Sequence, residues 1–169
     1  MYSQGEFLCV RCARQGKTCC QRSEIYVTPG DAQRIFRHTG LTGFYEYKPP
    51  ADPVYADQSD DPVWAEHVFD SGGRRRVLKR LASGDCLFLS QTGCILPLDI
   101  RPLVCRLYPY TYTASGIDRE LETGCPPNLL ADGQCLTDAL CMSADQAWEW
   151  HHILYEEVLA DGNDNRAVL

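Results

Sequence analysis

The sequence predicts a small, irregular α+β domain in which short β-hairpins and short helices precede a long C-terminal helix. Three observations predict this class. Glycine-containing turns separate short apolar runs, which is typical of hairpins. Capping residues mark the beginnings of helices. A final amphipathic segment, 143–160, is long enough for about five helical turns.

The first clear helix signal follows residue 28. Thr28 can act as the N-cap, and Pro29 suits the first helical position. Asp31 favours the positive end of the helix dipole, and Gly40 can end the helix. We expect a second short helix over 42–47, because Pro49 and Pro50 would end it, and a surface loop rich in Pro and Asp over 49–62. Residues 9–20, before the first helix, are expected to form a cysteine-bearing loop.

The long C-terminal helix has its own start and stop signals. Ser143 and Gln146 form a capping box, and the helix is expected to run to about Ala160, with Gly162 ending it. A projection at ~100° per residue gives one broad buried face. The residues expected on it are Trp148, Trp150, His151, Leu154, Tyr155, Val158 and Leu159.

Two hairpins are expected in the middle of the chain. Their turns are Ser71-Gly72-Gly73 and Gln91-Thr92-Gly93. The paired strands are expected over 63–69 with 75–81, and over 86–89 with 94–96.

The segment after the second hairpin should hold a short helix and a strand. Pro102 suits the first turn of a helix that Asp99 could cap and that ends near Cys105. Alternating tyrosines should then line one face of a strand, where structural packing is favoured over ligand binding. They are Tyr108, Tyr110 and Tyr112.

Composition excludes several classes of function. The formal net charge is -7, and the basic run over 74–76, with Lys79 and Arg80 after it, is short, so we expect a solvated strand or turn there and no nucleic-acid surface. The first ten residues lack the basic and apolar regions of a signal peptide, and no apolar stretch is long enough for a membrane span. We expect a cytoplasmic protein without a membrane partner.

Cysteine is the outlying residue, with 10 in 169 positions. These thiols could form disulfides, ligate metal, or pack as ordinary core residues. In a reducing cytoplasm, clustered cysteines at ligand spacing are more typical of metal sites than of disulfides. We therefore expect a metal-stabilised domain.

The N-terminal cysteines give the strongest local signal. Cys9 and Cys12 have the two-residue spacing of zinc ribbons and iron–sulfur loops. The neighbours Cys19 and Cys20 would point to opposite faces of an extended backbone. Either a tight turn brings them together, or they serve two centres, or one of them only packs.

Further thiols are expected as ligands from the second half of the chain: Cys86, Cys94, Cys105 and Cys125. The first two lie at the ends of a predicted hairpin, and Cys125 precedes Pro126 as in bacterial ferredoxin runs. Eight thiols could form two four-cysteine sites, or one cluster with structural cysteines. Cys135 and Cys141 are expected to be ordinary thiols.

Several of these motifs together resemble the YkgJ-type cysteine-cluster family. They are Cys9-Val-Arg-Cys12, Thr18-Cys19-Cys20, Thr28-Pro-Gly-Asp31, Gly84-Asp85-Cys86-Leu-Phe-Leu, Gly93-Cys94-Ile-Leu, Arg101-Pro102-Leu-Val-Cys105-Arg106-Leu-Tyr108-Pro109-Tyr110 and Gly124-Cys125-Pro126. The family is described as a zinc- or iron-chelating domain. The resemblance implies eight metal-chelating thiols and does not specify a reaction.

Charged and polar residues near the cysteines have two interpretations each. Arg101 and Arg106 flank Cys105 and could stabilise a negative thiolate cluster, or they could form surface salt bridges. His151 is expected to be a hydrogen-bonded core residue, with a role beside the metal as the alternative. Glu149 with His152 has the spacing of a di-iron half-motif, but only one copy is present, on the polar face.

The expected organisation is a cysteine-cluster domain over 1–135, with a C-terminal helix in 136–169 packed on the same domain. The leading hypothesis is a cytoplasmic protein with a cysteine-ligated iron–sulfur cluster, 4Fe–4S in type, acting in electron transfer or as an accessory to a redox or modifying enzyme. The alternative is a zinc-stabilised interaction module that docks a protein partner. A third option is metal trafficking.

Overall fold

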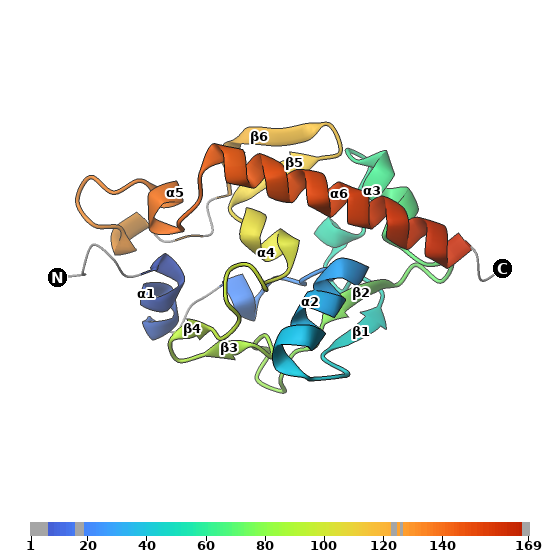
Figure 1. Ribbon diagram of the computed structural model, residues 1–169, viewed down its shortest axis with the longest axis horizontal. Helices are drawn as coiled ribbons and strands as arrows, with labels where there is room; N and C mark the ends of the chain where they lie inside the picture. The colour runs from blue at the N-terminus through green and yellow to red at the C-terminus, as the bar shows by residue number, and fades with distance from the viewer. Residues whose placement is uncertain (1–6, 16–18, 123–124, 126, 167–169) are drawn as a thin grey trace.

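The structure is a computed structural model that describes residues 7–15, 19–122, 125 and 127–166. It has the predicted α+β class, with small antiparallel sheets, several short helices and a long C-terminal helix (Figure 1). The α-helices are α1 Leu8–Arg14, α2 Pro29–Thr39, α3 Pro62–His67, α4 Leu103–Leu107, α5 Leu136–Ala139 and α6 Ala144–Arg166. Short 3-10 helices are η1 Cys19–Gln21, η2 Pro53–Tyr55 and η3 Pro127–Leu129.

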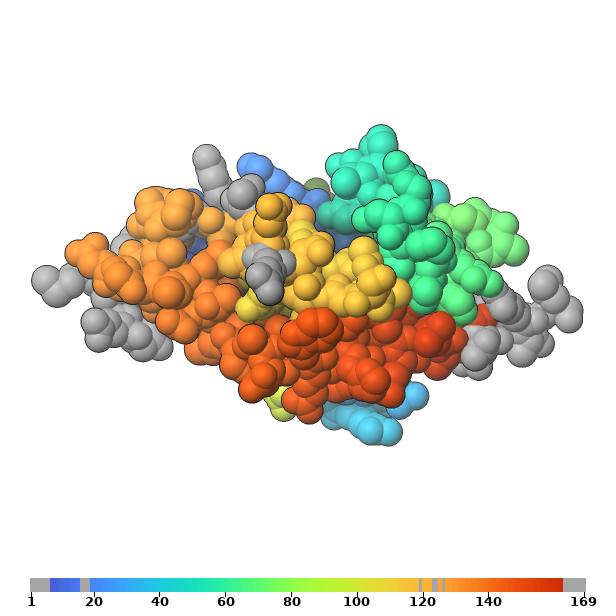
Figure 2. Space-filling model, turned by 90° about the horizontal axis from the view of Figure 1, so that it is seen from above, coloured from blue at the N-terminus to red at the C-terminus, as the bar shows by residue number. Residues whose placement is uncertain are grey.

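Three two-stranded antiparallel sheets occur in the described ranges. Their strands are β1 Tyr45–Lys48 with β2 Arg75–Leu78, β3 Leu89–Ser90 with β4 Gly93–Cys94, and β5 Tyr110–Thr113 with β6 Gly116–Leu121. The β3–β4 hairpin confirms the predicted turn over 91–93, although its strands are shorter than expected. Figure 2 shows the β5–β6 hairpin lying along α6 on one face of the molecule.

The start of α2 matches its prediction in detail. The Thr28 hydroxyl accepts a hydrogen bond from the Asp31 backbone N–H at 2.9 Å, and the Thr28 N–H donates to the Asp31 carboxylate at 3.2 Å. This is a reciprocal capping box, which satisfies two N–H groups that the helix cannot. Gly40 ends the helix with a φ of 70°.

The C-terminal helix begins as predicted but ends later. The Gln146 N–H donates to the Ser143 hydroxyl at 3.1 Å. The helix continues past Ala160 to residue 166, so the prediction that Gly162 stops it is wrong. A Cβ at Gly162 would lie 2.4 Å from Cδ2 of His67, and the glycine therefore permits the close packing of α3 against α6.

Three local predictions are wrong. Residues 8–14 form a helix where an irregular cysteine loop was expected. The segment expected to be a helix over 42–47 contains strand β1, and β1 rather than 63–69 is the partner of β2. Residues 62–67 are helical because Asp61 caps the Trp64 N–H at 3.2 Å and Pro62 occupies the first turn.

The basic run is buried, which corrects the prediction of a solvated surface. Arg75 pairs with Glu24 at 2.7 Å and is 3% exposed in its side chain. Arg76 pairs with Asp161 at 3.0 Å. Only Arg74 is exposed, beside Asp70. Each buried guanidinium thus has a carboxylate from a distant segment, as burial of a charge requires.

Two apolar cores lie on different sides of the molecule. The larger core packs α6 against α3 and α4, with Trp64, Leu107, Trp150 and Leu154 among its buried residues. The smaller core holds Ile35, Phe44, Phe88 and Leu96 near α2 and the first two sheets.

The predicted apolar face of α6 is partly wrong. Trp148 and Leu159 are 52% and 44% exposed, whereas the other five residues assigned to that face are buried or partly buried. The long helix therefore exposes part of its predicted apolar face to solvent. None of the described helices is long and apolar enough to cross a membrane.

The predicted cap of α4 is also wrong. Pro102 rather than Asp99 occupies the N-cap, and it makes no side-chain capping bond. The Leu103 N–H donates instead to both oxygens of the Asp31 carboxylate, at 3.1 and 3.3 Å. Asp31 thus serves the beginnings of both α2 and α4, and it fixes where the short cysteine-bearing helix starts.

Candidate metal centre

A cavity of about 620 Å³, partly open to solvent, is lined by eight cysteines. They are Cys9, Cys12, Cys19, Cys20, Cys86, Cys94, Cys105 and Cys125. Cys135 and Cys141 are exposed and do not line it. Protein interiors contain few voids larger than a water molecule, so a cavity of this size is a constructed space rather than a packing defect.

Five separate segments supply the eight thiols. Cys9 and Cys12 are one turn apart on α1, so the three-residue spacing places them on one helix face. Cys19 and Cys20 lie in η1, and Cys105 lies on α4. Cys86 and Cys94 flank the β3–β4 hairpin region, and Cys125 follows β6, while Pro126 lies outside the described residues.

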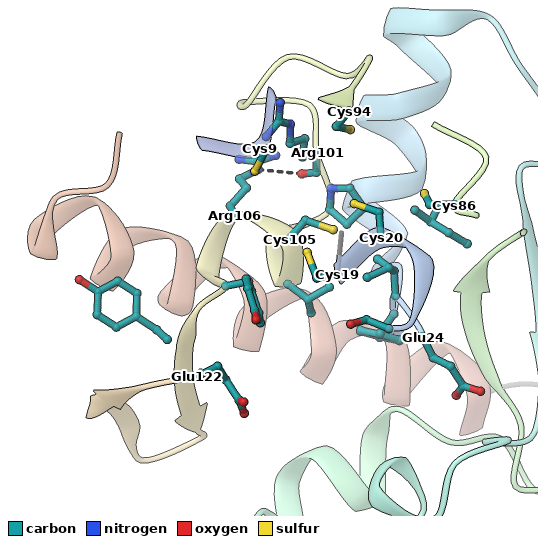
Figure 3. Close-up of a pocket in the computed structure, with 18 of the residues that line it drawn as sticks. Cys9, Cys19, Cys20, Glu24, Cys86, Cys94, Arg101, Cys105, Arg106 and Glu122 are labelled. Carbon is teal, nitrogen blue, oxygen red and sulfur yellow. Dashed lines mark hydrogen bonds between the residues drawn. The ribbon is translucent and has the colours of Figure 1, made fainter. Parts of the chain in front are cut away.

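Cys20 is at the centre of the group. In Figure 3 the sulfurs of Cys19, Cys20 and Cys105 point toward the same space, with Cys86 and Cys94 on its border. The tight turn of η1 resolves the geometric difficulty of adjacent cysteines, because Cys19 and Cys20 are close enough for a thiol hydrogen bond. Of the alternatives for this pair, the structure has the tight turn.

Backbone contacts hold the Cys20 and Cys86 segments together. The Cys86 N–H donates to the Cys20 carbonyl at 2.9 Å. The Arg80 guanidinium donates to the same carbonyl at 3.0 Å and to the Gly84 carbonyl at 2.6 Å. The sequence did not identify Arg80 as a contact to these carbonyls, because it follows a strand that was interpreted as part of a solvated basic run.

A glycine brings the other end of the cavity together. Gly93 has a φ of +96°, and a Cβ there would lie 3.4 Å from the backbone carbonyl oxygen of Cys9. The positive φ favours glycine at this position, and the β3–β4 hairpin packs against α1 beside it. The contact places Cys94 beside the N-terminal cysteine pair.

Burial raises the pKa of seven of these thiols. The pKa rises to about 12 for Cys9 and to about 11 for Cys86 and Cys125. The pKa of Cys105 lies well above its ordinary value, first because of burial and then because of Cys20. Neighbouring thiolates would repel one another, so the metal-free group is stable only with most of its protons.

The two arginines predicted near the thiols differ in position. Arg101 lies beside two cysteines, and its charge opposes the effect of burial on the pKa values of Cys9 and Cys94. Its Nε donates to the Leu96 carbonyl at 2.9 Å, and the guanidinium stacks on Phe7 with 5.0 Å to the ring centroid. Neither arginine forms a surface salt bridge with a described residue.

Arg106 is buried and acts on the backbone. It donates to the Arg101 carbonyl at 2.7 Å and to the Asp99 carbonyl at 2.6 Å. Burial lowers the pKa of this guanidinium. Its contacts hold the loop before α4 in place, which positions Arg101 and Cys105.

His151 has the structural role that was expected. One ring nitrogen, Nε2, lies 2.7 Å from the Thr113 carbonyl, and the ring packs on Tyr112 and Tyr155. His151 does not line the cavity. The Glu149–His152 half-motif also lies away from it, and His152 instead pairs with Glu156 at an exposed position.

The cavity extends beyond the thiols to a polar and aromatic wall that sequence reasoning missed. Glu24, Asp61, Trp64 and Tyr155 line it, together with all three tyrosines of the alternating row. Figure 3 shows Glu24 and Glu122 at the end of the site away from Cys9 and Cys94. Asp61 was assigned to a surface loop, and only its position before a proline could have indicated a helix cap.

The lining thiols are donors of the kind that soft metals bind. Thiolates are the usual ligands of zinc and of iron–sulfur clusters. Nevertheless, within the described ranges no three Cys, His, Asp or Glu residues are grouped so that they could hold a metal ion. The sulfurs thus surround a common space without converging on a single point.

No family model matches the chain, and neither a curated protein nor a solved structure matches it significantly. The resemblance to the YkgJ-type family consequently depends on the quoted motifs alone.

Proposed function

We propose that the chain is a cysteine-ligated metal protein of the YkgJ type whose centre is an iron–sulfur cluster, and that it acts in electron transfer or as an accessory to a redox or modifying enzyme. One observation carries the proposal. The eight cysteines selected by spacing line one cavity, and the two judged ordinary are exposed outside it. The cavity separates the ten cysteines into the same two groups as the motifs do.

The number of thiols and the size of the space favour a cluster over one zinc ion. A structural zinc takes four ligands at about 2.3 Å. The cavity of about 620 Å³ is lined by eight thiols, which is more than one zinc ion needs. The alternative is a zinc-stabilised interaction module, since four of the thiols could serve zinc and the rest could pack.

Metal loading would require small movements of the thiols. Each cysteine side chain has one rotatable bond before its sulfur, so inward rotation can bring lining thiols together without a change of fold. Cys20 is the central candidate, because it interacts electrostatically with six of the other lining thiols. They are Cys9, Cys12, Cys19, Cys86, Cys94 and Cys105. Arg101 would offset part of the negative charge of the bound centre.

The test is metal analysis of protein purified without oxygen. The proposal expects a brown protein with broad visible absorption, bound iron and acid-labile sulfide. Colourless protein with stoichiometric zinc would contradict the cluster and support the interaction module. Protein that binds neither metal would contradict both.

A matched pair of variants links the metal to the cavity. Cys105→Ser should lower the metal content by at least about half, because serine is a poor ligand for soft metals. Cys135→Ser makes the same chemical change at an exposed position outside the cavity and should leave metal content unchanged. Equal metal content in the two variants would remove Cys105 from the ligand set.

A further inference from the structure

The cavity wall opposite the thiols has features of a second binding site. Asp61 lines this part and is only 5% exposed. Its carboxylate accepts hydrogen bonds from the Trp64 N–H at 3.2 Å and from the Tyr155 hydroxyl. Among the ion pairs of the described residues none includes Asp61. A buried carboxylate with only neutral partners is costly, and a cation from outside would offset that cost.

Aromatic rings surround this carboxylate. The Tyr155 ring centroid lies 6.2 Å from that of Trp64 and 6.4 Å from that of Tyr112, in both cases edge to face. All three residues line the cavity. Aromatic faces attract organic cations, especially where water is excluded.

Tyr112 offers a polar group that the protein does not use. It is half-buried and lines the cavity, and its hydroxyl takes part in none of the hydrogen bonds between described residues. Burial and the nearby Cys105 both raise the pKa of this hydroxyl, so it is neutral and can donate or accept. Cys105 and Asp61 are both close enough to influence this hydroxyl electrostatically.

The other charges at this wall do not compete for the site. Arg75 of β2 lines the cavity and is already paired with Glu24 at 2.7 Å. Asp60 and Glu122 add negative charge near the opening. The excess of negative charge at this end favours a positive ligand.

We infer that the cavity holds a second site, formed by Asp61, Trp64, Tyr112 and Tyr155, that binds the ammonium group of a small primary amine next to the thiol wall. Asp61 accepts hydrogen bonds from the ammonium, the rings enclose its carbon chain, and the Tyr112 hydroxyl orients it. The cavity is partly open to solvent, so a small molecule can reach the site. The inference extends the proposed function, but its residues are separate from the thiols.

The probe is n-butylammonium chloride, titrated calorimetrically into the intact protein. Potassium chloride at equal ionic strength and n-butanol are the controls for charge alone and for the carbon chain alone. Butylammonium should bind at least about tenfold more tightly than n-butanol, because only the ammonium pairs with the carboxylate. Equal affinities, or an absence of butylammonium binding, would overturn the inference.

Two variants test the named groups. Asp61→Asn keeps a residue able to cap α3 and should weaken butylammonium binding by about tenfold or more without affecting n-butanol. Tyr112→Phe removes only the hydroxyl and should weaken binding a few-fold. The matched control Glu156→Gln removes an exposed carboxylate of α6 and should change nothing. The inference fails if a folded Asp61→Asn or Tyr112→Phe variant binds butylammonium as tightly as the Glu156→Gln control.

Metal content measured on the same samples separates the two proposals. Asp61→Asn should retain the wild-type metal content while it loses amine binding. Wild-type protein that binds butylammonium but contains no metal would contradict only the proposed function, whereas metal-loaded protein without amine selectivity would contradict only the second site.

Discussion

Arg80→Met tests whether the cysteine segments are held together by the contacts described above. The Arg80 guanidinium donates to two backbone carbonyls, of Cys20 and Gly84, at 3.0 and 2.6 Å. Methionine preserves much of the side-chain length and removes the donors. We expect η1 to loosen and the position of Cys20 to become less defined.

The size of the effect follows from the partners that remain. A hydrogen bond to a charged group contributes about 1.5–3 kcal/mol. The Cys20 carbonyl retains its bond from the Cys86 N–H, so most of the loss falls on the Gly84 carbonyl. We expect a loss of about 2 kcal/mol in the free energy of unfolding. With a urea dependence of about 2 kcal/mol per molar, the midpoint should fall by about 1 M.

Arg74→Met is the matched control for this measurement. Arg74 lies in the same basic run, and its side chain is 56% exposed and pairs only with Asp70. Exposed ion pairs contribute about 0–1 kcal/mol, so its urea midpoint should fall by less than about 0.5 M. Iodoacetamide labelling mapped by mass spectrometry should rise at Cys20 in the metal-free Arg80 variant alone. Equal midpoints and equal labelling in both variants would refute the role of Arg80.

Two further changes test the packing around the site. Burial opposes ionisation of Glu24, but the Ala51 N–H and Arg75 outweigh burial and lower the pKa of this carboxyl. Its contribution to stability is therefore present above pH 4.5, the ordinary pKa, and is lost as the pH falls through the lowered pKa. Glu24→Gln should therefore destabilise the protein by about 3 kcal/mol at neutral pH. The difference in unfolding free energy between variant and wild type, measured by urea titration, should become smaller below pH 4.5, and a constant difference would contradict the reasoning. Gly162→Ala should gain about 1 kcal/mol of helix propensity and lose about 2 kcal/mol by overpacking against His67. Its thermal midpoint should fall by about 3 °C, and a rise would show that the contact with His67 is not tight.

Local signals in the sequence predicted the elements whose cause is local. The capping box of Thr28 and Asp31 and the cap at Ser143 depend on residues three apart, and both are present. A helix was predicted near 42–47 and a strand near 63–69, whereas the structure has β1 and α3 there. Local signals could not assign these two segments. The strand β1 exists because β2, far along the chain, pairs with it, Tyr45 with Leu78 and Lys48 with Arg75.

The site was predictable in its donors but not in its surroundings. Cysteine spacing selected all eight lining thiols, since the chemistry of a thiolate group is visible in residue type. The supporting contacts are non-local, such as Asp31 with the start of α4 and Arg80 with η1. The same carboxylate and guanidinium types occur throughout the chain, so nothing in their local sequence distinguishes these two.

The distribution of the thiols between the two cores gives the cavity its physical meaning. Cys9, Cys12 and Cys125 pack against the larger core, whereas Cys20, Cys86 and Cys94 belong to or pack against the smaller one. The cavity therefore lies where the two cores meet, and apolar packing is interrupted there. A metal centre bound by thiols from both groups would join the cores across this gap. Because such a centre binds only the folded arrangement, its binding free energy would add directly to the stability of the fold.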